Sequence, residues 1–381
     1  MPTLTLDMGG GSLKLGFSDK SSPSVIDNCI FKSKTLSGRT FIGSEIEKCN
    51  NFSSLYCIMP FKKGYLNNWD IQTQILDTAM KKIFKERNFK PSDCNLICTE
   101  PYFNFSSTKE TMNEIFFEEY QFSAVMRTNP AFLSAYKYQT ESAQRLSRYC
   151  LVVDSGYSFT HIVPMCDGRV MSEFVIRLTV GGKILTNRLV EIVSYRANPR
   201  RNPIVREYVL PDYADVHRGY VRDPSTEQPA QGNGTLSSDQ TRATQQGYVL
   251  RLNNERFTIP ELIFHPSDVG YAEMGLTEAM GYLLSERLPS AVRPGAWANC
   301  LVTGGNACFP GFVERLRLDL RSVAPDDLPV NIFKPNNPQV YAWEGGALLA
   351  NETEDLKRFL VTRAEYEECG SAQSERRFPV S

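Results

Sequence analysis

Hydrophobic and polar positions follow two different periods along the first half of the chain. Short apolar runs at 4–6, 13–17 and 95–99 are typical of buried strands. Residues 68–87 instead carry an apolar side chain at every fourth position from Ile71 onward, which predicts a helix with one face on a core. Strands that alternate with helices predict parallel pairing and right-handed crossovers, so we expect an α/β fold.

Ser107 and Glu110 have the spacing of a capping box, and we expect them to open a helix that runs through Phe116. The second half repeats the alternation of strands and helices. We expect strands at 149–153, 159–164 and 300–303, and helices at 182–193, 273–288, 312–323 and from 341 onward.

Three Gly-Gly pairs, at 181–182, 304–305 and 345–346, stand where predicted helices begin. Free N–H groups and the helix dipole favour anions at such positions. For 345–346, tight packing of one helix against a neighbour is an equally good interpretation.

Two predicted strands end in acidic turns that contain glycine, at 7–12 and 154–161. A carboxylate at the end of a strand can face a hydrated divalent cation, and glycines let backbone N–H groups reach phosphate oxygens. One such turn could be an ordinary hairpin turn. Two of them, in successive halves of the chain, favour a nucleotide cleft.

Composition limits the classes of protein to consider. A chain of 381 residues is longer than one hydrophobic core usually organises, so we expect two lobes. The formal net charge of -1 implies no global attraction to nucleic acid or anionic membrane, and any DNA contact would be local. We expect no signal peptide and no membrane span, since no apolar run approaches about 18 residues.

The 10 cysteines lack disulfide or C-x-x-C spacing, so we expect a reducing compartment, nucleus or cytoplasm. Cys94 and Cys98 are expected to be small buried residues beside the strand at 95–99. The 3 histidines are far apart, which argues against a zinc site.

Three further segments stand out. Residues 222–247 are polar and rich in glycine, and we expect a disordered surface loop there. Residues 197–203 are basic and bracketed by proline, which fits either a solvated connector or a local DNA contact. The aromatic run at 101–105 is either part of the core or an anchor for a partner.

The motifs at 7–17, 154–161, 302–305 and 343–346 resemble those of the actin family, a branch of the actin, hsp70 and sugar-kinase superfamily. The resemblance runs nearly end to end and implies an actin-like ATPase fold, with two related lobes around a central nucleotide cleft. It divides the chain into a first lobe at 1–137, which contains a small insertion at about 30–60, and a second lobe at 138–340. The second lobe contains the loop at about 222–247 and a shortened segment at 197–203. The C-terminal helices at 341–381 return to the first lobe.

Longer strings are similar to nuclear actin-related members of the family. They imply a non-motor subunit of a SWR/SRCAP-type chromatin remodeller, which exchanges a variant histone into nucleosomes and regulates transcription. The implied partners are the motor ATPase subunit and a zinc-HIT-type subunit, with the nucleosome reached indirectly or by a local contact and no membrane contact. The implied location is the nucleus, with the cytoplasm as an additional place. These strings are 60–66, 99–105, 117–122, 154–164, 208–213 and 341–346.

The resemblance also implies a structural ATP with Mg²⁺ in the cleft. Asp7 and Asp154 would face the metal through water, and Lys14 would reach the β-phosphate. The other implied nucleotide contacts are Gly9, Gly10, Gly11 and Ser12 in the first phosphate loop, Ser155 and Gly156 in the second, Gly182, Gly304 and Gly305 beside the nucleoside, and Phe309 near the adenine.

Several residues depart from the hydrolytic pattern of the family. Pro130 stands where conventional actin has a glutamine that orients the attacking water, and a proline side chain cannot do this. Tyr157 and Ser158 replace an Asp-Gly pair in the second phosphate loop. His161 is kept, either as a solvent contact near a γ-phosphate or as a packed hairpin residue.

These departures predict a scaffold with at most structural nucleotide binding and no catalytic residue. Met8 and Gly10 replace polar residues of the first phosphate loop, which weakens the case for turnover further. A weakly active ATPase and a small-molecule kinase are the alternatives. The segment at 30–58, which matches the polymerisation loop of actin, is short, so filament formation is not expected.

Overall fold

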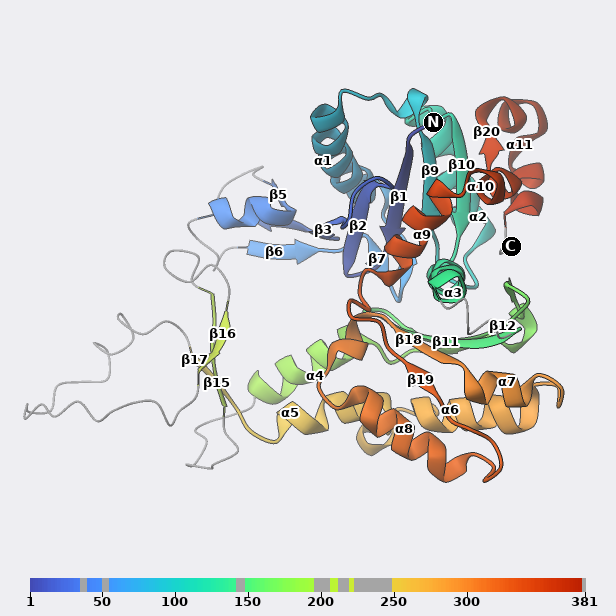
Figure 1. Ribbon diagram of the computed structural model, residues 1–381. Helices are drawn as coiled ribbons and strands as arrows, with labels where there is room; N and C mark the ends of the chain where they lie inside the picture. The colour runs from blue at the N-terminus through green and yellow to red at the C-terminus, as the bar shows by residue number, and fades with distance from the viewer. Residues whose placement is uncertain are drawn as a thin grey trace, which may run out of the picture.

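The computed structural model describes residues 1–34, 40–49, 55–141, 148–194, 206–211, 219–222 and 249–378. These residues form two lobes that lie one above the other in Figure 1, each with a six-stranded sheet. The predicted segment at 197–203 and the predicted loop at 222–247, apart from Arg222, lie outside the described residues.

The first sheet is built around β1, whose residues are all buried. Strand β1 (Thr3–Met8) runs parallel to β9 (Asn95–Thr99), and β9 runs parallel to β10 (Ala124–Thr128). The predicted parallel pairing is therefore confirmed. β1 also forms an antiparallel hairpin with β2, in which Asp7 lies opposite Lys14. In sheet order the strands are β20 (Val361–Thr362), β10 (Ala124–Thr128), β9 (Asn95–Thr99), β1 (Thr3–Met8), β2 (Ser12–Phe17) and β3 (Ser24–Asp27).

The second sheet repeats this local arrangement. β11 runs parallel to β18 and antiparallel to β12, so Asp154 lies opposite both His161 and Thr303. β14 pairs with β12 beside the main order. The strands are β13 (Arg169–Val170), β12 (Thr160–Cys166), β11 (Tyr149–Ser155), β18 (Cys300–Thr303), β19 (Ile332–Phe333) and β14 (Ile176–Leu178).

Smaller sheets flank the two lobes. The predicted insertion forms a three-stranded sheet in the order β5 (Thr40–Ile42), β4 (Ile30–Ser33) and β6 (Leu55–Ile58), at the side of the first lobe in Figure 1. The other small sheets are β16 (Tyr220–Arg222), β15 (Arg206–Val209) and β17 (Val249–Leu252), and the hairpin of β7 (Phe61–Lys62) and β8 (Tyr65–Leu66).

The helix predicted at 68–87 is confirmed as α1 (Trp69–Arg87). Asn68 caps its first turn, because its side chain accepts the Ile71 N–H. The predicted capping box at Ser107 is wrong. The helix α2 (Ser106–Asn113) begins one residue earlier, with Phe105 at the N-cap and no side-chain cap, so Ser107 already lies within its first turn. The helix continues as a π-helical segment, Glu114–Glu119.

The helix predicted at 273–288 begins later, at α6 (Leu276–Tyr282), and continues as a π-helical segment, Leu283–Arg287. Glu273 lies outside it, because its carboxylate accepts the backbone N–H groups of Thr179 and Val180 at 2.7 and 3.2 Å. The other α-helices of the described residues are α3 (Pro130–Glu141), α4 (Gly182–Ser194), α5 (Glu255–Thr258), α7 (Arg293–Ala298), α8 (Phe312–Val323), α9 (Tyr341–Asn351), α10 (Thr353–Phe359) and α11 (Arg363–Arg377).

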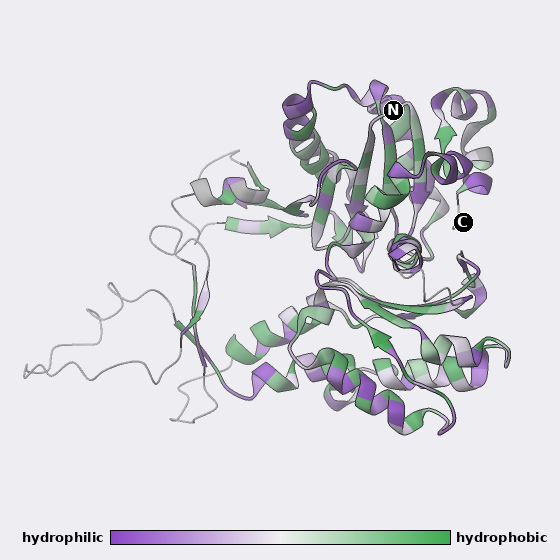
Figure 2. Cartoon of the chain, viewed as in Figure 1, coloured by the Kyte–Doolittle hydropathy of each residue, from purple (hydrophilic) through white to green (hydrophobic). Residues whose placement is uncertain are grey.

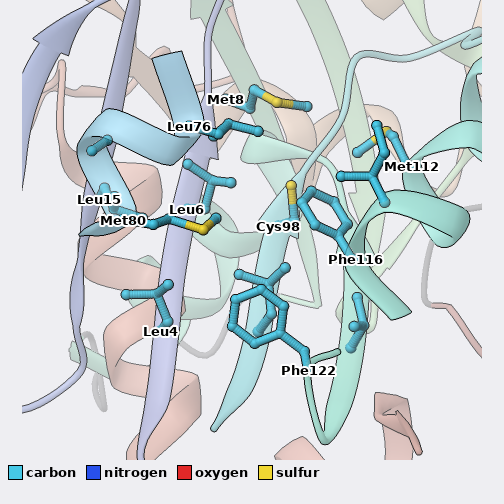
Figure 3. Close-up of a cluster of buried hydrophobic side chains, with 14 of the residues drawn as sticks. Leu4, Leu6, Met8, Leu15, Leu76, Met80, Cys98, Met112, Phe116 and Phe122 are labelled. Carbon is cyan, nitrogen blue, oxygen red and sulfur yellow. The ribbon is translucent and has the colours of Figure 1, made fainter. Parts of the chain in front are cut away.

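Three hydrophobic clusters hold these elements together. The first lies between the first sheet and helices α1 and α2, and Figure 3 shows part of it, including Leu6, Leu76 and Phe116. The second lies in the second lobe, where the hydropathy colouring of Figure 2 shows helices with an apolar and a polar side. The third contains Met126 and Val152 and so joins the two lobes. Cys94 and Cys98 are fully buried, as predicted.

Helix α9 packs closely on α3 and on β1 between the lobes (Figure 1). The helix predicted from 341 onward is confirmed, since α9 begins at Tyr341, but Gly345 and Gly346 lie inside it and not at its first residues. A Cβ on Gly345 would lie 2.0 Å from the Leu133 carbonyl oxygen. Of the two interpretations of this glycine pair, the structure therefore supports tight packing of one helix against its neighbour. The Trp343 indole N–H donates to the Thr5 carbonyl oxygen at 3.1 Å. Within the described ranges, no helix is long and apolar enough to cross a membrane.

We expect Gly345→Ala to lower the free energy of unfolding by about 1–3 kcal/mol or more, because the added methyl group overpacks the contact with α3. The matched control is Gly281→Ala in α6, where the new Cβ would lie 3.4 Å from the nearest Val323 atom. This control should be neutral or stabilising by up to about 1 kcal/mol, since alanine favours a helix. Urea denaturation measures both, and equal stabilities would contradict the packing argument.

Candidate functional site

A cavity of about 510 Å³ lies where the two acidic hairpin turns meet. Its volume is in the range of small-molecule sites. Residues of both hairpin turns, 7–12 from the first and Asp154 and 156–159 from the second, line this cavity. The predicted site residues among its lining are Asp7, Gly9, Gly10, Gly11, Ser12, Lys14, Asp154, Gly156, Gly304 and Gly305.

Both carboxylate oxygens of Asp7 have partners. The Lys14 ammonium lies 3.0 Å from Asp7 Oδ2, and the Thr99 hydroxyl donates to Asp7 Oδ1 at 2.8 Å. Thr99 also accepts the Met8 N–H at 2.8 Å, so it fixes both the side chain and the start of the loop. This role of Thr99 could not be predicted from the sequence, because its only local signal is a hydroxyl at the end of a strand.

Asp154 has a different electrostatic environment. Burial and, to a smaller extent, the negative charge of Asp7 raise the pKa of its carboxyl from 3.8 to about 6, although Lys14 partly offsets both effects. Two carboxylates that face one cavity, one of them costly to ionise, form a donor set that fits a hydrated divalent cation. The residues present therefore fit the predicted Mg²⁺, held through water.

The two loops contact each other directly. A Cβ on Gly11 would lie 2.8 Å from the Tyr157 ring, and one on Gly10 would lie 2.4 Å from the Ser158 hydroxyl oxygen. A methyl group at Gly10 or Gly11 would force the Ser158 or Tyr157 side chain to move, so glycine permits the two loops to lie this close. Tyr157 and Ser158, which depart from the family pattern, therefore fill the space beside the first loop.

Two asparagines that no sequence motif indicates hold the loops in place. The Asn28 amide donates to the Gly9 carbonyl oxygen at 2.9 Å, and its backbone N–H donates to the Gly11 carbonyl oxygen at 3.1 Å. The Asn306 amide donates to the Gly156 carbonyl oxygen at 2.9 Å. Neither asparagine belongs to the turns themselves, so only their position in space reveals the role.

Three predicted nucleotide contacts do not line the cavity. The Ser155 hydroxyl is buried and bonded to Thr160 and Asn306. The Gly182 N–H donates to the Gly156 carbonyl oxygen at 3.0 Å. Phe309 packs against the hydrophobic core of the second lobe. Their contacts with a nucleotide stay predictions.

His161 and Pro130 both line the cavity. His161 contacts the rings of Tyr102 and Phe159, whose centroids lie 5.3 and 5.2 Å from that of the imidazole. Burial and the positive charge of Arg177 lower its pKa to about 3, so the imidazole is neutral at pH 7. Pro130 starts α3 with a side chain that has neither donor nor acceptor.

The sequence model of the actin family matches residues 1–203 and 194–379. The chain belongs to the actin family. Actin-related protein 6 of Drosophila melanogaster is 36% identical over 403 residues, which cover 96% of this chain and 97% of that protein. Actin-like protein ARP6 of Cryptococcus neoformans is 34% identical, over 99% of this chain and 84% of that protein. Actin-related protein 6 of Oryza sativa is 30% identical over 98% of each chain. Membership of the family supports an actin-like ATPase fold, and the two sheets with their shared cavity agree with it.

We expect Asp154→Asn to stabilise the fold in a pH-dependent manner. Because the carboxyl pKa is higher in the folded chain, its ionisation lowers the free energy of unfolding as pH rises from 3.8 to about 6. Relative to the parent chain, the variant should therefore gain little at pH 3.8 and up to about 3 kcal/mol above pH 6.

Urea denaturation without nucleotide or metal, at the two ends of this pH range, measures the difference in the free energy of unfolding. An equal difference at both pH values would contradict the assigned burial and repulsion.

Proposed function

We propose that this chain is a non-motor scaffold subunit of a nuclear SWR/SRCAP-type chromatin-remodelling complex. Such a complex exchanges a variant histone into nucleosomes and so regulates transcription. The observation that carries the proposal is similarity to proteins named actin-related protein 6 over 96–99% of the chain. The nuclear location is part of the proposal and rests on these relatives.

We further propose that ATP with Mg²⁺ is a structural ligand of the cleft. Asp7 and Asp154 would hold the metal through water, and Lys14 would approach the phosphates. The bound metal would supply positive charge between the two carboxylates and so offset their repulsion. Residues of both lobes line the cavity, so a ligand there would bridge them. Binding of this kind stabilises the folded chain without any chemical step.

The same site argues against hydrolysis. Pro130 offers no group that could orient a water molecule. His161 is neutral and packed against two aromatic rings, so it supplies no positive charge to a γ-phosphate. Tyr157 and Ser158 lie against the first loop, which leaves less room beside it. A weakly active ATPase remains the competing function.

The proposed partners are the motor ATPase of the complex and its zinc-HIT-type subunit, with the nucleosome reached indirectly or by a local contact. The aromatic run at 101–105 divides into two kinds of residue. Tyr102 is buried and donates to Asn129 at 2.5 Å, whereas the side chains of Phe103 and Phe105 are exposed. Exposed aromatic residues are common anchors in protein interfaces. We propose that Phe103 and Phe105 contact a protein partner.

Measurements of ATP binding and of ATP turnover distinguish a structural role of the nucleotide from an enzymatic one. We expect Lys14→Met to weaken MgATP binding by about 10-fold to 100-fold, the cost of a hydrogen bond to a charged group. Lys20→Met is the matched control, because Lys20 lies on the surface 3.5 Å from Glu86. A fluorescent ATP analogue measures affinity, and phosphate release is followed in the same samples.

Phosphate release should be as slow in the parent chain as in an Asp7→Ala, Asp154→Ala double variant. Faster release from the parent chain would support the ATPase instead.

The scaffold role predicts that the full chain co-purifies from nuclear extract with a remodeller motor and a zinc-HIT protein. The Phe103→Ala, Phe105→Ala double variant should recover at least several-fold less of them, because two exposed anchors are lost. Phe257→Ala is the matched control, since its ring is exposed to a similar extent, 58% against 55% and 58%. Recovery of the parent chain as a free monomer, or with cytoplasmic filaments, would contradict the proposal.

A further inference from the structure

Two cysteine thiols lie together at the edge of the cavity. Cys57 is in β6, and Cys29 immediately precedes β4. These strands are antiparallel, with Phe31 opposite Cys57 and Ile30 opposite Ile58. Because side chains alternate between the two faces of a sheet, Cys29 and Cys57 are diagonal neighbours on one face. Their side chains form a hydrogen bond.

The two thiols differ in accessibility and in acidity. Cys29 is buried, and Cys57 is exposed. The pKa of Cys57 is lowered to about 7, chiefly by the hydrogen bond from Cys29 and to a smaller extent by Lys183, although burial and Asp27 oppose this change. The same hydrogen bond, burial and Asp27 raise the pKa of Cys29. At neutral pH the accessible sulfur is therefore about half in the thiolate form, and the buried sulfur keeps its proton. Thiolate character combined with access is what makes a cysteine reactive.

The pair is connected to the loops of the cavity, which both thiols line. Asn28, the residue before Cys29, holds Gly9 and Gly11 of the first loop. From the second loop, the Tyr157 hydroxyl reaches the Met59 sulfur at 3.7 Å, two residues after Cys57. The two thiols also raise the pKa of the Tyr157 hydroxyl, after the larger effect of its burial.

Three buried cysteines of the sheets differ from this pair. Cys98, Cys150 and Cys300 are buried, and burial raises the pKa of each thiol. They are therefore inert structural residues. Cys308 and Cys369 are exposed and lie elsewhere on the chain, so they provide internal controls for accessibility.

We propose that Cys29 and Cys57 form a redox-active dithiol that is oxidised by a hydroperoxide, with Cys57 as the attacking thiol and Cys29 as the resolving thiol. The Cys57 thiolate attacks one peroxide oxygen, so an S–O bond forms, the O–O bond breaks, and the departing hydroxide takes up a proton. The Cys29 thiol then attacks the Cys57 sulfur, the S–S bond forms, and the S–O bond breaks to release water. Overall the dithiol loses two electrons and two protons, and hydrogen peroxide becomes two molecules of water.

Alkylation of the full chain by iodoacetamide at pH 7, read by peptide mass spectrometry, tests the attacking thiol. Cys57 should react about fivefold faster than Cys308 or Cys369, because its larger thiolate fraction outweighs the lower nucleophilicity of a more acidic thiol. Cys29→Ala should remove this advantage, whereas Cys29→Ser should retain part of it through the hydroxyl donor.

Treatment of the same protein with stoichiometric hydrogen peroxide tests the resolving thiol. The parent chain should give a linked peptide that contains Cys29 and Cys57 and is released by dithiothreitol. Cys29→Ala should instead leave a sulfenic acid on Cys57 that dimedone traps. Two results on the parent chain would overturn the proposal without depending on any variant: alkylation of Cys57 no faster than that of Cys308 and Cys369, or no Cys29–Cys57 link after peroxide.

Discussion

The structure depends on two carboxylates that face one cavity from the ends of two buried strands. The negative charge of Asp7 is stabilised by the Lys14 ammonium and by a hydrogen bond from Thr99. Burial and the charge of Asp7 instead raise the pKa of Asp154 to about 6. Such an arrangement costs free energy in the empty chain at neutral pH. A hydrated cation between the carboxylates would offset that cost. The balance of charges at this site therefore favours a bound cation, independently of any hydrolysis.

The layer between the lobes explains how both carboxylates are held in place. Helices α3 and α9 pack against each other and, with strands of both sheets, form a shared hydrophobic cluster. Gly345 permits the close approach of the helices, and Trp343 is bonded to the backbone of β1 at Thr5. The loops of the cavity are further bound to one another by Tyr157 and Ser158. A change beside these loops, such as oxidation of the Cys29–Cys57 dithiol, therefore acts on the loops of both lobes.

Much of the fold could be predicted, because local periodicity reflects which face of an element is buried. Helix α1 and strands β9 and β18 lie where the apolar pattern places them. The errors occur where a side chain has a distant partner or a neighbouring residue competes for the same role. Glu273 bonds to the backbone beside β14 instead of starting α6. Ser107 has capping chemistry, yet the helix already begins at Ser106.

The sequence by itself determined the two strand–turn–strand units, with Asp7 and Asp154 at the ends of their strands, because turn chemistry and apolar alternation act over a few residues. Only the tertiary structure decided which distant groups form hydrogen bonds with these two units. Thr99 reaches Asp7 across 92 positions, and Asn28 reaches Gly9 across 19. The Cys29–Cys57 pair likewise depends on strand register. Such contacts depend on how whole elements pack, and no local preference for a helix, strand or turn encodes that packing.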